Sequence, residues 1–329
     1  MNRLFCGISL FVALCSAVSL SAHSCDSMVR PLFLREGDTV AVVSISSKLP
    51  KKVDRQFIRR LESWGLTVQL GEHLFCRDTG WFATTDCNRA ADLQRAIDDP
   101  SVKAVLFCRG GYGAIRTLDY LCLDSLRQHP KWFVGFSDLT VMHYALLKRG
   151  IESIHGAMPL EFLSDTTVTD SSALSLREAL WGRLESYRIP PHPLNRVGCA
   201  RGRLVGGNLS LVEAVNGTDI DDPLETPSIL FIEEVGESIY RIDRMLQTLL
   251  RSGKLNRVKA FVVGHFTRTM HEKEWGQQVY ELIAAYADRL GVPVLFGFPA
   301  GHSYPNYSLY MGREILLSVT LEGGLLEFL

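Results

Sequence analysis

The feature of this sequence that most constrains its fold is the alternation of short apolar runs with segments of helical spacing. Thr39–Ile45, Lys103–Cys108 and Lys131–Phe136 are apolar runs of six or seven residues, as in strands that are buried on both faces. Val53–Trp64 and Cys87–Asp98 separate them with helical spacing or composition. Strands that alternate with helices predict a parallel sheet covered by helices on both faces.

The alternation resumes in the second half of the chain after an irregular stretch. Thr, Ser and Asp cluster at 164–172 and three prolines cluster at 190–193, which is typical of a domain boundary. We therefore predict an amino-terminal domain at 30–165, a linker at 166–199 and a smaller carboxy-terminal α/β domain at 200–329. The remaining predicted helices are Ala114–Leu126, Asp138–Arg149, Ile239–Arg251 and Gln277–Leu290, and the remaining strands are Ser228–Ile232, Val258–Gly264, Val292–Gly297 and Glu314–Thr320.

Composition and charge limit the classes of partner. Hydrophobic residues make up 47% and charged residues 22% of the 329 residues, which is ordinary for a globular protein with a sizeable core. The formal net charge is −1, so no basic field is available to bind a nucleic-acid backbone. A small molecule or a peptide is the expected partner.

The first 25 residues have the pattern of a secretory signal peptide. Arg3 gives a positive start, Leu4–Leu20 is an apolar run, and small residues follow at 19–24. An uncleaved anchor is the alternative, but the run is short for a span that needs about 20 apolar residues. Cys25 lies where a lipoprotein acceptor would, although His23 makes that match poor. We expect the chain to be exported, cleaved after the signal, periplasmic and without a stable membrane span. If residues 1–25 are not a signal, the expected location is cytoplasmic.

Cysteines and histidines give no metal or redox pattern. The six cysteines that follow the apolar run contain no C-x-x-C pair, and the chain has no H-E-x-x-H. We therefore predict neither a metal nor a cofactor. Cys76 and Cys87 flank one loop-like segment and are the only plausible local disulfide, with unpaired, buried thiols as the alternative.

Ser137 lies where a predicted strand ends and a predicted helix begins. Such a break exposes a serine hydroxyl above the sheet edge and directs the next backbone N–H, that of Asp138, at the same point. The alternative is a helix N-cap, for which Ser is a preferred residue. Leu139 stands where the G-x-S-x-G pattern needs its second glycine, so that pattern is not met.

A glycine-rich stretch, Arg109–Gly113, follows another predicted strand. Its backbone N–H groups, including that of Gly111, suit an anion or a developing oxyanion, although a simple tight turn is compatible with the same residues. The dinucleotide pattern fails because its third glycine is missing. Arg109 could bind a substrate carboxylate through its planar guanidinium or pair with an acid such as Asp119.

An acid and a histidine complete a hydrolase pattern. Glu233 and Glu234 follow an apolar run, which places them at the carboxyl end of a strand, where open α/β sheets bind ligands. His302 lies in a Gly/Pro-rich loop that would hold a general base in place, while His155 and His265 remain competitors. The order Ser, Glu, His is one that hydrolases use, and it predicts a site in a cleft between the two domains.

At these residues the chain resembles the LD-carboxypeptidase family, also called muramoyltetrapeptide carboxypeptidases. The resemblance covers about 290 residues. It implies a Ser-Glu-His triad formed by Ser137, Glu233 and His302, without metal. The matching stretches, in order, are Arg109–Gly113, Gly135–Thr140, His155-Gly156, Gly206–Ser210, Ile229–Gly236 with Tyr240–Arg244, and Gly301-His302 with Asn306.

The resemblance also implies an activity and an assembly. The family removes the carboxy-terminal D-alanine from murein tetrapeptides, its amino-terminal sheet is related in style to glutamine-amidotransferase folds, and its members are usually homodimers. A related branch hydrolyses peptidyl-nucleotide antibiotics for self-immunity. A non-catalytic, two-domain periplasmic binding protein is the alternative from another class, and it would have no need of all three triad residues.

Overall fold

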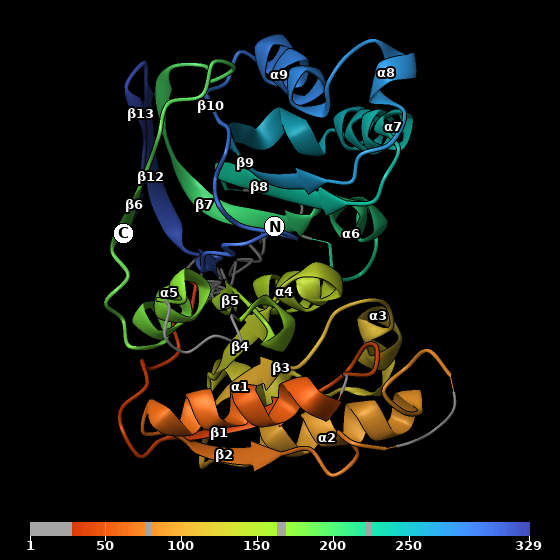
Figure 1. The fold of residues 1–329 in the computed structure, drawn as a ribbon, viewed down its shortest axis with the longest axis vertical. Helices are drawn as coiled ribbons and strands as arrows, with labels where there is room; N and C mark the ends of the chain where they lie inside the picture. The colour runs from red at the N-terminus through yellow and green to blue at the C-terminus, as the bar shows by residue number, and fades with distance from the viewer. Residues whose placement is uncertain (1–27, 50, 77–79, 163–168, 222–225) are drawn as a thin grey trace, which may run out of the picture.

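The computed structural model describes residues 28–49, 51–76, 80–162, 169–221 and 226–329, which form two α/β layers stacked on each other (Figure 1). The signal peptide predicted at 1–25 lies outside these residues. Among the described residues, no helix is both long and apolar enough to cross a membrane.

The first sheet is parallel except at one edge. Its strand order within the described residues is β11-β5-β4-β3-β1-β2, and only β11 runs antiparallel to its neighbour, β5. The parallel α/β arrangement predicted from the sequence is therefore confirmed. The strands are β1 (Thr39–Val43), β2 (Thr67–Leu70), β3 (Val102–Phe107), β4 (Trp132–Gly135), β5 (Ser153–His155) and β11 (Leu309–Met311).

Helices cover both faces of this sheet. Val40 and Val42 of β1 pack in the same apolar cluster as Phe57 of α1 (Lys51–Ser63), whereas Ala41 and Val43 pack in the cluster that contains Leu93 of α2 (Asp86–Asp98). The alternation along one strand is what a sheet buried on both faces requires. The other helices of this layer are α3 (Ala114–Thr117), α4 (Thr140–Lys148) and α5 (Ser171–Leu180).

The second sheet is half parallel and half antiparallel. Its order is β10-β9-β8-β7-β12-β13-β6, with parallel pairing from β10 to β7 and antiparallel pairing from β7 to β6. Its strands are β6 (Ser186–Ile189), β7 (Gly198–Asn208), β8 (Ser228–Val235), β9 (Val258–Thr267), β10 (Val294–Leu295), β12 (Glu314–Thr320) and β13 (Gly323–Phe328), and its helices are α6 (Leu209–Ala214), α7 (Ile239–Arg251), α8 (Glu272–Trp275) and α9 (Val279–Leu290).

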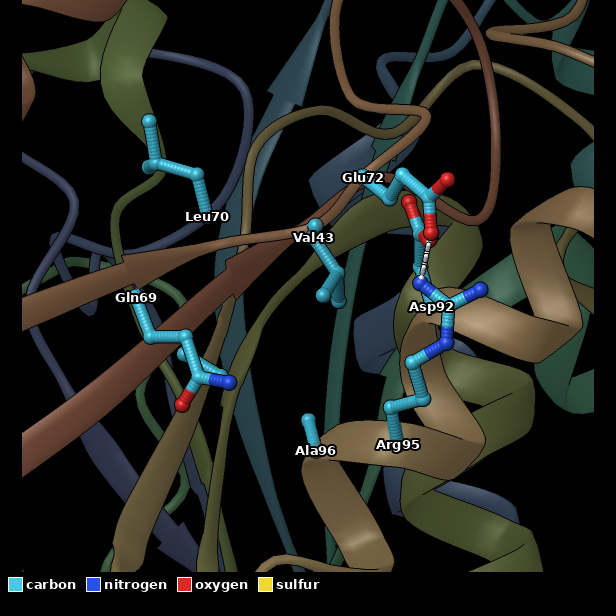
Figure 2. Close-up of a pocket in the computed structure, with 9 residues that line it drawn as sticks. Val43, Gln69, Leu70, Glu72, Asp92, Arg95 and Ala96 are labelled. Atoms are coloured by element: carbon cyan, nitrogen blue, oxygen red, sulfur yellow. Dashed lines mark hydrogen bonds and ion pairs between the residues drawn. The ribbon is translucent and has the colours of Figure 1, made fainter.

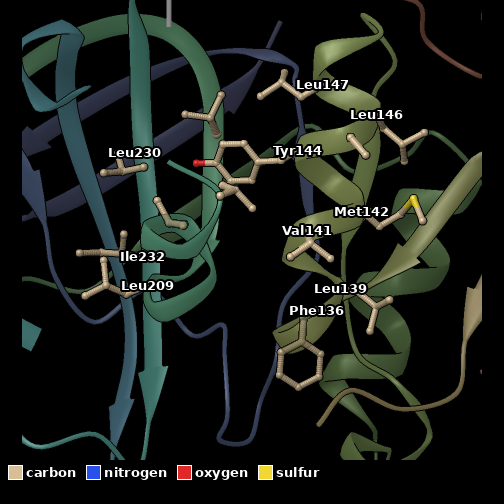
Figure 3. Packing of buried hydrophobic residues seen from close by; sticks show 14 of the residues in the cluster. Phe136, Leu139, Val141, Met142, Tyr144, Leu146, Leu147, Leu209, Leu230 and Ile232 are labelled. Atoms are coloured by element: carbon tan, nitrogen blue, oxygen red, sulfur yellow. The ribbon is translucent and has the colours of Figure 1, made fainter. Parts of the chain in front are cut away.

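Helix α4 joins the two layers. Figure 3 shows Val141 and Tyr144 of α4 on the side of the helix that faces Leu209 and Leu230 of the second layer, and all four are almost fully buried. Burial of each such apolar side chain contributes roughly 1.5–3 kcal/mol to the free energy of folding. Because α4 starts next to Ser137, this packing also fixes the start of the helix relative to the second sheet.

Some elements differ from the sequence predictions. The helix predicted at Ala114–Leu126 was wrong: α3 ends at Thr117, and 3₁₀ turns follow at Leu118–Tyr120 and Asp124–Arg127. The predicted linker, within its described residues, holds α5 and β6, and β11 from the carboxy-terminal part completes the first sheet. The chain therefore crosses between the layers more often than the predicted boundaries imply.

The disulfide considered between Cys76 and Cys87 is not formed, and both residues are free thiols.

Candidate active site

Ser137 occupies a strained turn between β4 and α4. Its φ is +62°, in the left-handed region that non-glycine residues rarely enter. A 3₁₀ turn, Ser137–Leu139, leads from the strand into α4. Strain of this kind costs about 1–3 kcal/mol and persists only where the surrounding structure imposes it, which is common at active sites. The turn is the strand–serine–helix break that the sequence predicted.

Three side chains form one continuous chain of hydrogen bonds. His302 Nε2 lies 2.8 Å from Ser137 Oγ, and His302 Nδ1 lies 2.6 Å from Glu233 Oε2. Glu233 is fully buried near the carboxyl end of β8. An acid bonded to Nδ1 leaves Nε2 free to accept the proton of the serine hydroxyl, which is the geometry of a serine hydrolase.

The pKa of His302 reflects this setting. Burial lowers it, but the negative charges of Glu233, Glu234 and Glu161 outweigh burial, so the net pKa lies above the ordinary value for histidine. These surroundings therefore favour the charged form of the imidazole more than water does, so an imidazolium formed here would be stabilised.

The loop that carries His302 is fixed from two sides. Asn306 is buried, and its Oδ1 accepts the N–H of Gly301 at 2.9 Å. The ring of Phe136 lies 4.9 Å from the imidazole, measured between ring centroids. A Cβ on Gly301 would lie 2.7 Å from Glu233 Oε2, so this position needs glycine for the acid and the histidine to meet.

The glycine-rich turn lies directly against Ser137. A Cβ on Gly110 would lie 3.0 Å from Ser137 Oγ and 3.4 Å from the backbone nitrogen of Asp138. Gly111 has φ +104° and faces Ser47 in the same way. Sequence reasoning singled out Gly111, whereas the neighbouring Gly110 makes the closest approach to the serine.

Asp138 and Arg109 have different surroundings. The carboxylate of Asp138 is buried and accepts Ser46 Oγ at 2.5 Å and the N–H of Ala114 at 2.7 Å, so only its backbone N–H remains for a ligand beside Ser137. The half-buried guanidinium of Arg109 donates to the carbonyl of Lys48. Arg109 and Asp119, both described in the structure, do not form the ion pair that the sequence offered as the alternative.

Glu161 is a site residue that sequence reasoning missed. Its Oε2 accepts the N–H of Met158 at 3.0 Å in the turn after β5. Burial raises its pKa to about 7, while the charges of His302 and Arg109 act in the opposite direction, which places the carboxyl within electrostatic reach of both. The sequence feature that could have pointed to Glu161 is its position shortly after a strand of the first sheet.

Glu234 faces away from His302. Its carboxylate accepts the side-chain amide of Asn208 at 3.0 Å and the N–H of Ser210 at 2.8 Å. The N–H of Asn208 in turn donates to Thr140 Oγ1 at 3.0 Å. The second acid of the pair therefore anchors the end of β7, which contacts the first turn of α4.

The competing histidines do not contact Ser137. His155 is fully buried with Phe231 edge-on at 4.9 Å, and burial holds its pKa well below the ordinary value. Burial also lowers the pKa of His265. In the part of the chain that the structure describes, no group of His, Cys, Asp and Glu could hold a metal ion.

The cavity shown in Figure 2 lies away from these residues. It has a volume of about 100 Å³ and is lined by Gln69, Leu70, Glu72 and Arg95, among others, between β2 and α2. An ion pair between Glu72 and Arg95 crosses its edge. No triad residue lines it, and it is too small for a peptide.

The two-layer α/β fold and the Ser–His–Glu chain define a serine hydrolase architecture, and sequence comparison gives its family. The chain belongs to the LD-carboxypeptidase family: residues 40–156 match the LD-carboxypeptidase N-terminal domain and residues 201–317 match the C-terminal domain. It is thus a serine-type carboxypeptidase.

Relatives and solved structures agree with this family. The chain is 30% identical to the murein tetrapeptide carboxypeptidase of Pseudomonas aeruginosa, over 84% of this chain and 92% of that protein. A carboxypeptidase-named protein of Synechocystis is 37% identical over 92% of this chain and 98% of its own length. The crystal structure of muramoyltetrapeptide carboxypeptidase from Oxalobacter formigenes superposes with a TM-score of 0.79 at 29% identity, covering 88% of this chain and 98% of that one.

Proposed function

We propose that this protein removes the carboxy-terminal D-alanine from murein tetrapeptides, with Ser137 as nucleophile, His302 as general base and Glu233 as the acid that orients it. The observation that carries the proposal is the unbroken hydrogen-bonded chain from Glu233 through His302 to Ser137. The similarity to proteins named for murein peptides supports the substrate class.

The geometry fits an acyl-enzyme mechanism. Ser137 Oγ attacks the carbonyl carbon of the terminal amide while His302 Nε2 takes the hydroxyl proton. The carbonyl oxygen becomes an oxyanion beside the N–H of Asp138 and the Gly110–Gly111 turn. The C–N bond then breaks as His302 gives its proton to the leaving amine of D-alanine. Water, deprotonated by His302, hydrolyses the ester and restores Ser137.

Charged groups near the triad support an exopeptidase. A carboxypeptidase must recognise a free terminal carboxylate, and Arg109 directly precedes the turn that would hold the oxyanion. Its planar guanidinium suits bidentate carboxylate binding. We assign Arg109 this role, with Gly111 and Asp138 contributing backbone N–H groups.

A self-immunity peptidase acting on a peptidyl nucleotide is the second candidate. Two structures of the microcin C7 self immunity protein MccF superpose with a TM-score of 0.78 but are 20% identical, a likeness that concerns the fold alone. A non-catalytic binding protein fits less well, because it has no use for a strained Ser137 bonded to a half-buried His302 that is itself bonded to a buried Glu233.

Incubation of the purified protein with tetrapeptide and pentapeptide stems tests the proposal. We expect mass loss of one alanine from the tetrapeptide only, because the pentapeptide ends in a D,D bond. Ser137→Ala protein is the matched control. An unchanged tetrapeptide, or equal cleavage by the Ser137→Ala variant, would contradict the proposal, and cleavage of an aminoacyl nucleotide instead would favour the second candidate.

We further propose that the chain is exported after loss of residues 1 to about 24 and acts outside the cytoplasm as a homodimer. The signal-like pattern at Leu4–Leu20 and the family's usual assembly support this. Amino-terminal sequencing of the protein from its native host tests export, since a mature chain that starts at Met1 or Met28 in the cytosol contradicts it. Light scattering of the mature protein tests the dimer.

A further inference from the structure

Arg89 of α2 is a fully buried cation close to the glycine-rich turn. Its guanidinium donates to the carbonyl of Gly113 at 3.0 Å, to the carbonyl of Ile45 and to the carboxylate of Asp86. It also lies over the ring of Phe82, 4.8 Å from the centroid. Because a buried charge is costly unless it is paired and hydrogen-bonded, these contacts are what allow an arginine here.

Asp138 holds the other side of the same peptide bond. Its Oδ2 accepts the N–H of Ala114 at 2.7 Å, while Arg89 holds the carbonyl of Gly113. Ser46 donates to the same oxygen of Asp138 at 2.5 Å. The Gly113–Ala114 peptide is therefore held between a buried cation and a buried carboxylate, with one charge on its C=O and the other on its N–H.

This peptide ends the turn that lies on Ser137. The carbonyl of Gly110 accepts the N–H of Ser47 at 3.2 Å, which ties the other end of the turn to the segment after β1. A Cβ on Gly113 would lie 2.6 Å from the guanidinium of Arg89, so only glycine admits this contact. With both ends held, the Gly110–Gly111 backbone keeps its distance from the serine hydroxyl.

We propose that Arg89 and Asp138 are positioning residues that hold the Gly110–Gly113 turn so that the backbone N–H groups of Gly110 and Gly111 meet the oxyanion formed at Ser137. The inference rests on the proposed serine mechanism and adds to it two side chains that touch neither substrate nor reacting atoms. Oxyanion donors act through preorganised geometry, and a displacement of about 1 Å can lower turnover by about 10²-fold.

Arg89→Met tests the proposal, with Lys131→Met as the matched control. Lys131 is another buried cation that donates to main-chain carbonyls, of Ala96 (3.0 Å) and Asp99, but it precedes β4 whereas the site follows that strand. Both changes should lower stability. Only Arg89→Met should lower kcat, by about 10²-fold as for loss of an oxyanion donor, with KM little changed. Arg89→Lys, which keeps the charge but not the planar guanidinium, should lie between wild type and Arg89→Met.

A second readout separates positioning from general weakening. A boronic acid analogue of the substrate forms a tetrahedral adduct on Ser137, so its affinity should fall in Arg89→Met in parallel with kcat/KM, while a non-reactive tetrapeptide analogue binds as before. Ser46→Ala, which removes one bond to Asp138 without removing a charge, should show the same pattern at smaller amplitude and carries the test if Arg89→Met does not fold.

The positioning role would be overturned if folded Arg89→Met and Lys131→Met had equal kcat and equal boronate affinity. If Arg89→Met does not fold, the same conclusion would follow from equal values in Ser46→Ala and wild type. That result would leave the triad intact. Retained turnover in Ser137→Ala would instead overturn the proposed mechanism, so the two failures are distinguishable.

Discussion

The imidazole of His302 bonds Ser137 at 2.8 Å although 165 residues separate the two in the chain. Ser137 follows a strand of the first sheet, and His302 lies in a loop that follows a strand of the second. The hydrogen-bonded chain therefore exists only when the two layers are packed together. Any change that loosens their contact should lower turnover before it unfolds either sheet.

Ser137→Ala should abolish release of D-alanine while leaving the fold intact. Removing a triad member can cost about six orders of magnitude in turnover, because the remaining residues act as a unit. Mass spectrometry of tetrapeptide digests measures the loss, and circular dichroism confirms folding. Turnover near that of the wild type would exclude Ser137 as the nucleophile.

Ser137→Gly should be more stable than Ser137→Ala. Both variants lack the hydroxyl, so the difference between them isolates the backbone strain at φ +62°. A left-handed conformation costs an L-residue about 1–2 kcal/mol that glycine does not incur, and glycine's greater unfolded-state entropy offsets part of the gain. Denaturant unfolding of the two variants measures this difference. A Ser137→Gly protein that is less stable than Ser137→Ala would show that the turn is not strained.

Glu233→Gln and Glu234→Gln should have different consequences. Glu233→Gln keeps the shape but leaves the tautomer of His302 poorly specified, so turnover should fall by about three to four orders of magnitude. Glu234→Gln replaces an oxygen that accepts N–H groups of Asn208 or Ser210, so it should lower stability more than turnover. Kinetics and unfolding of both variants test this. Normal turnover in Glu233→Gln would reject that residue as the acid.

The sequence predicted β1, β3 and β4 of the parallel strands in the first sheet but not β2 or β5, and it predicted three residues that the structure brings together. Ser137 and Glu233 follow apolar runs, and burial on both faces makes such runs visible, whereas His302 needed the family resemblance. Strand β7 was missed because Gly198, Gly202, Gly206 and Gly207 lower strand propensity, and the strand forms because a close backbone approach, such as that of Gly206 to the carbonyl of Phe231, requires them. Glu161 was missed because only tertiary packing brings this half-buried carboxyl within electrostatic reach of His302.

The acid limb of the pH profile should move when Glu161 is neutralised. Catalysis needs neutral His302, so kcat/KM falls as the pH drops through the raised pKa of that histidine. Glu161 is the smallest of the charges that raise this pKa, and its own pKa of about 7 leaves it only partly charged on this limb, so Glu161→Gln should lower the pKa of His302 slightly and preserve activity to a slightly lower pH. Glu322→Gln, an exposed acid on the β12–β13 turn, is the control and should leave the profile unchanged. Coincident acid limbs in wild type and Glu161→Gln would contradict this electrostatic link.

Gly207→Ala should disturb the contact between the layers. Gly207 has φ +137°, and an added Cβ would lie 2.5 Å from Oγ1 of the buried Thr140, whose β-branched side chain has little freedom to move. Backbone strain should cost about 1–2 kcal/mol, and overpacking about 1–3 kcal/mol more.

Gly217→Ala is the matched control. Gly217 has φ +81°, but no atom lies within 4 Å of the added Cβ, so only the strain applies. We expect Gly207→Ala to lose more stability than Gly217→Ala in denaturant unfolding, and to have a lower kcat in its folded fraction because Thr140 belongs to the first turn after Ser137. Equal losses of stability with unchanged kcat would mean that α4 and β7 can separate without disturbing the site.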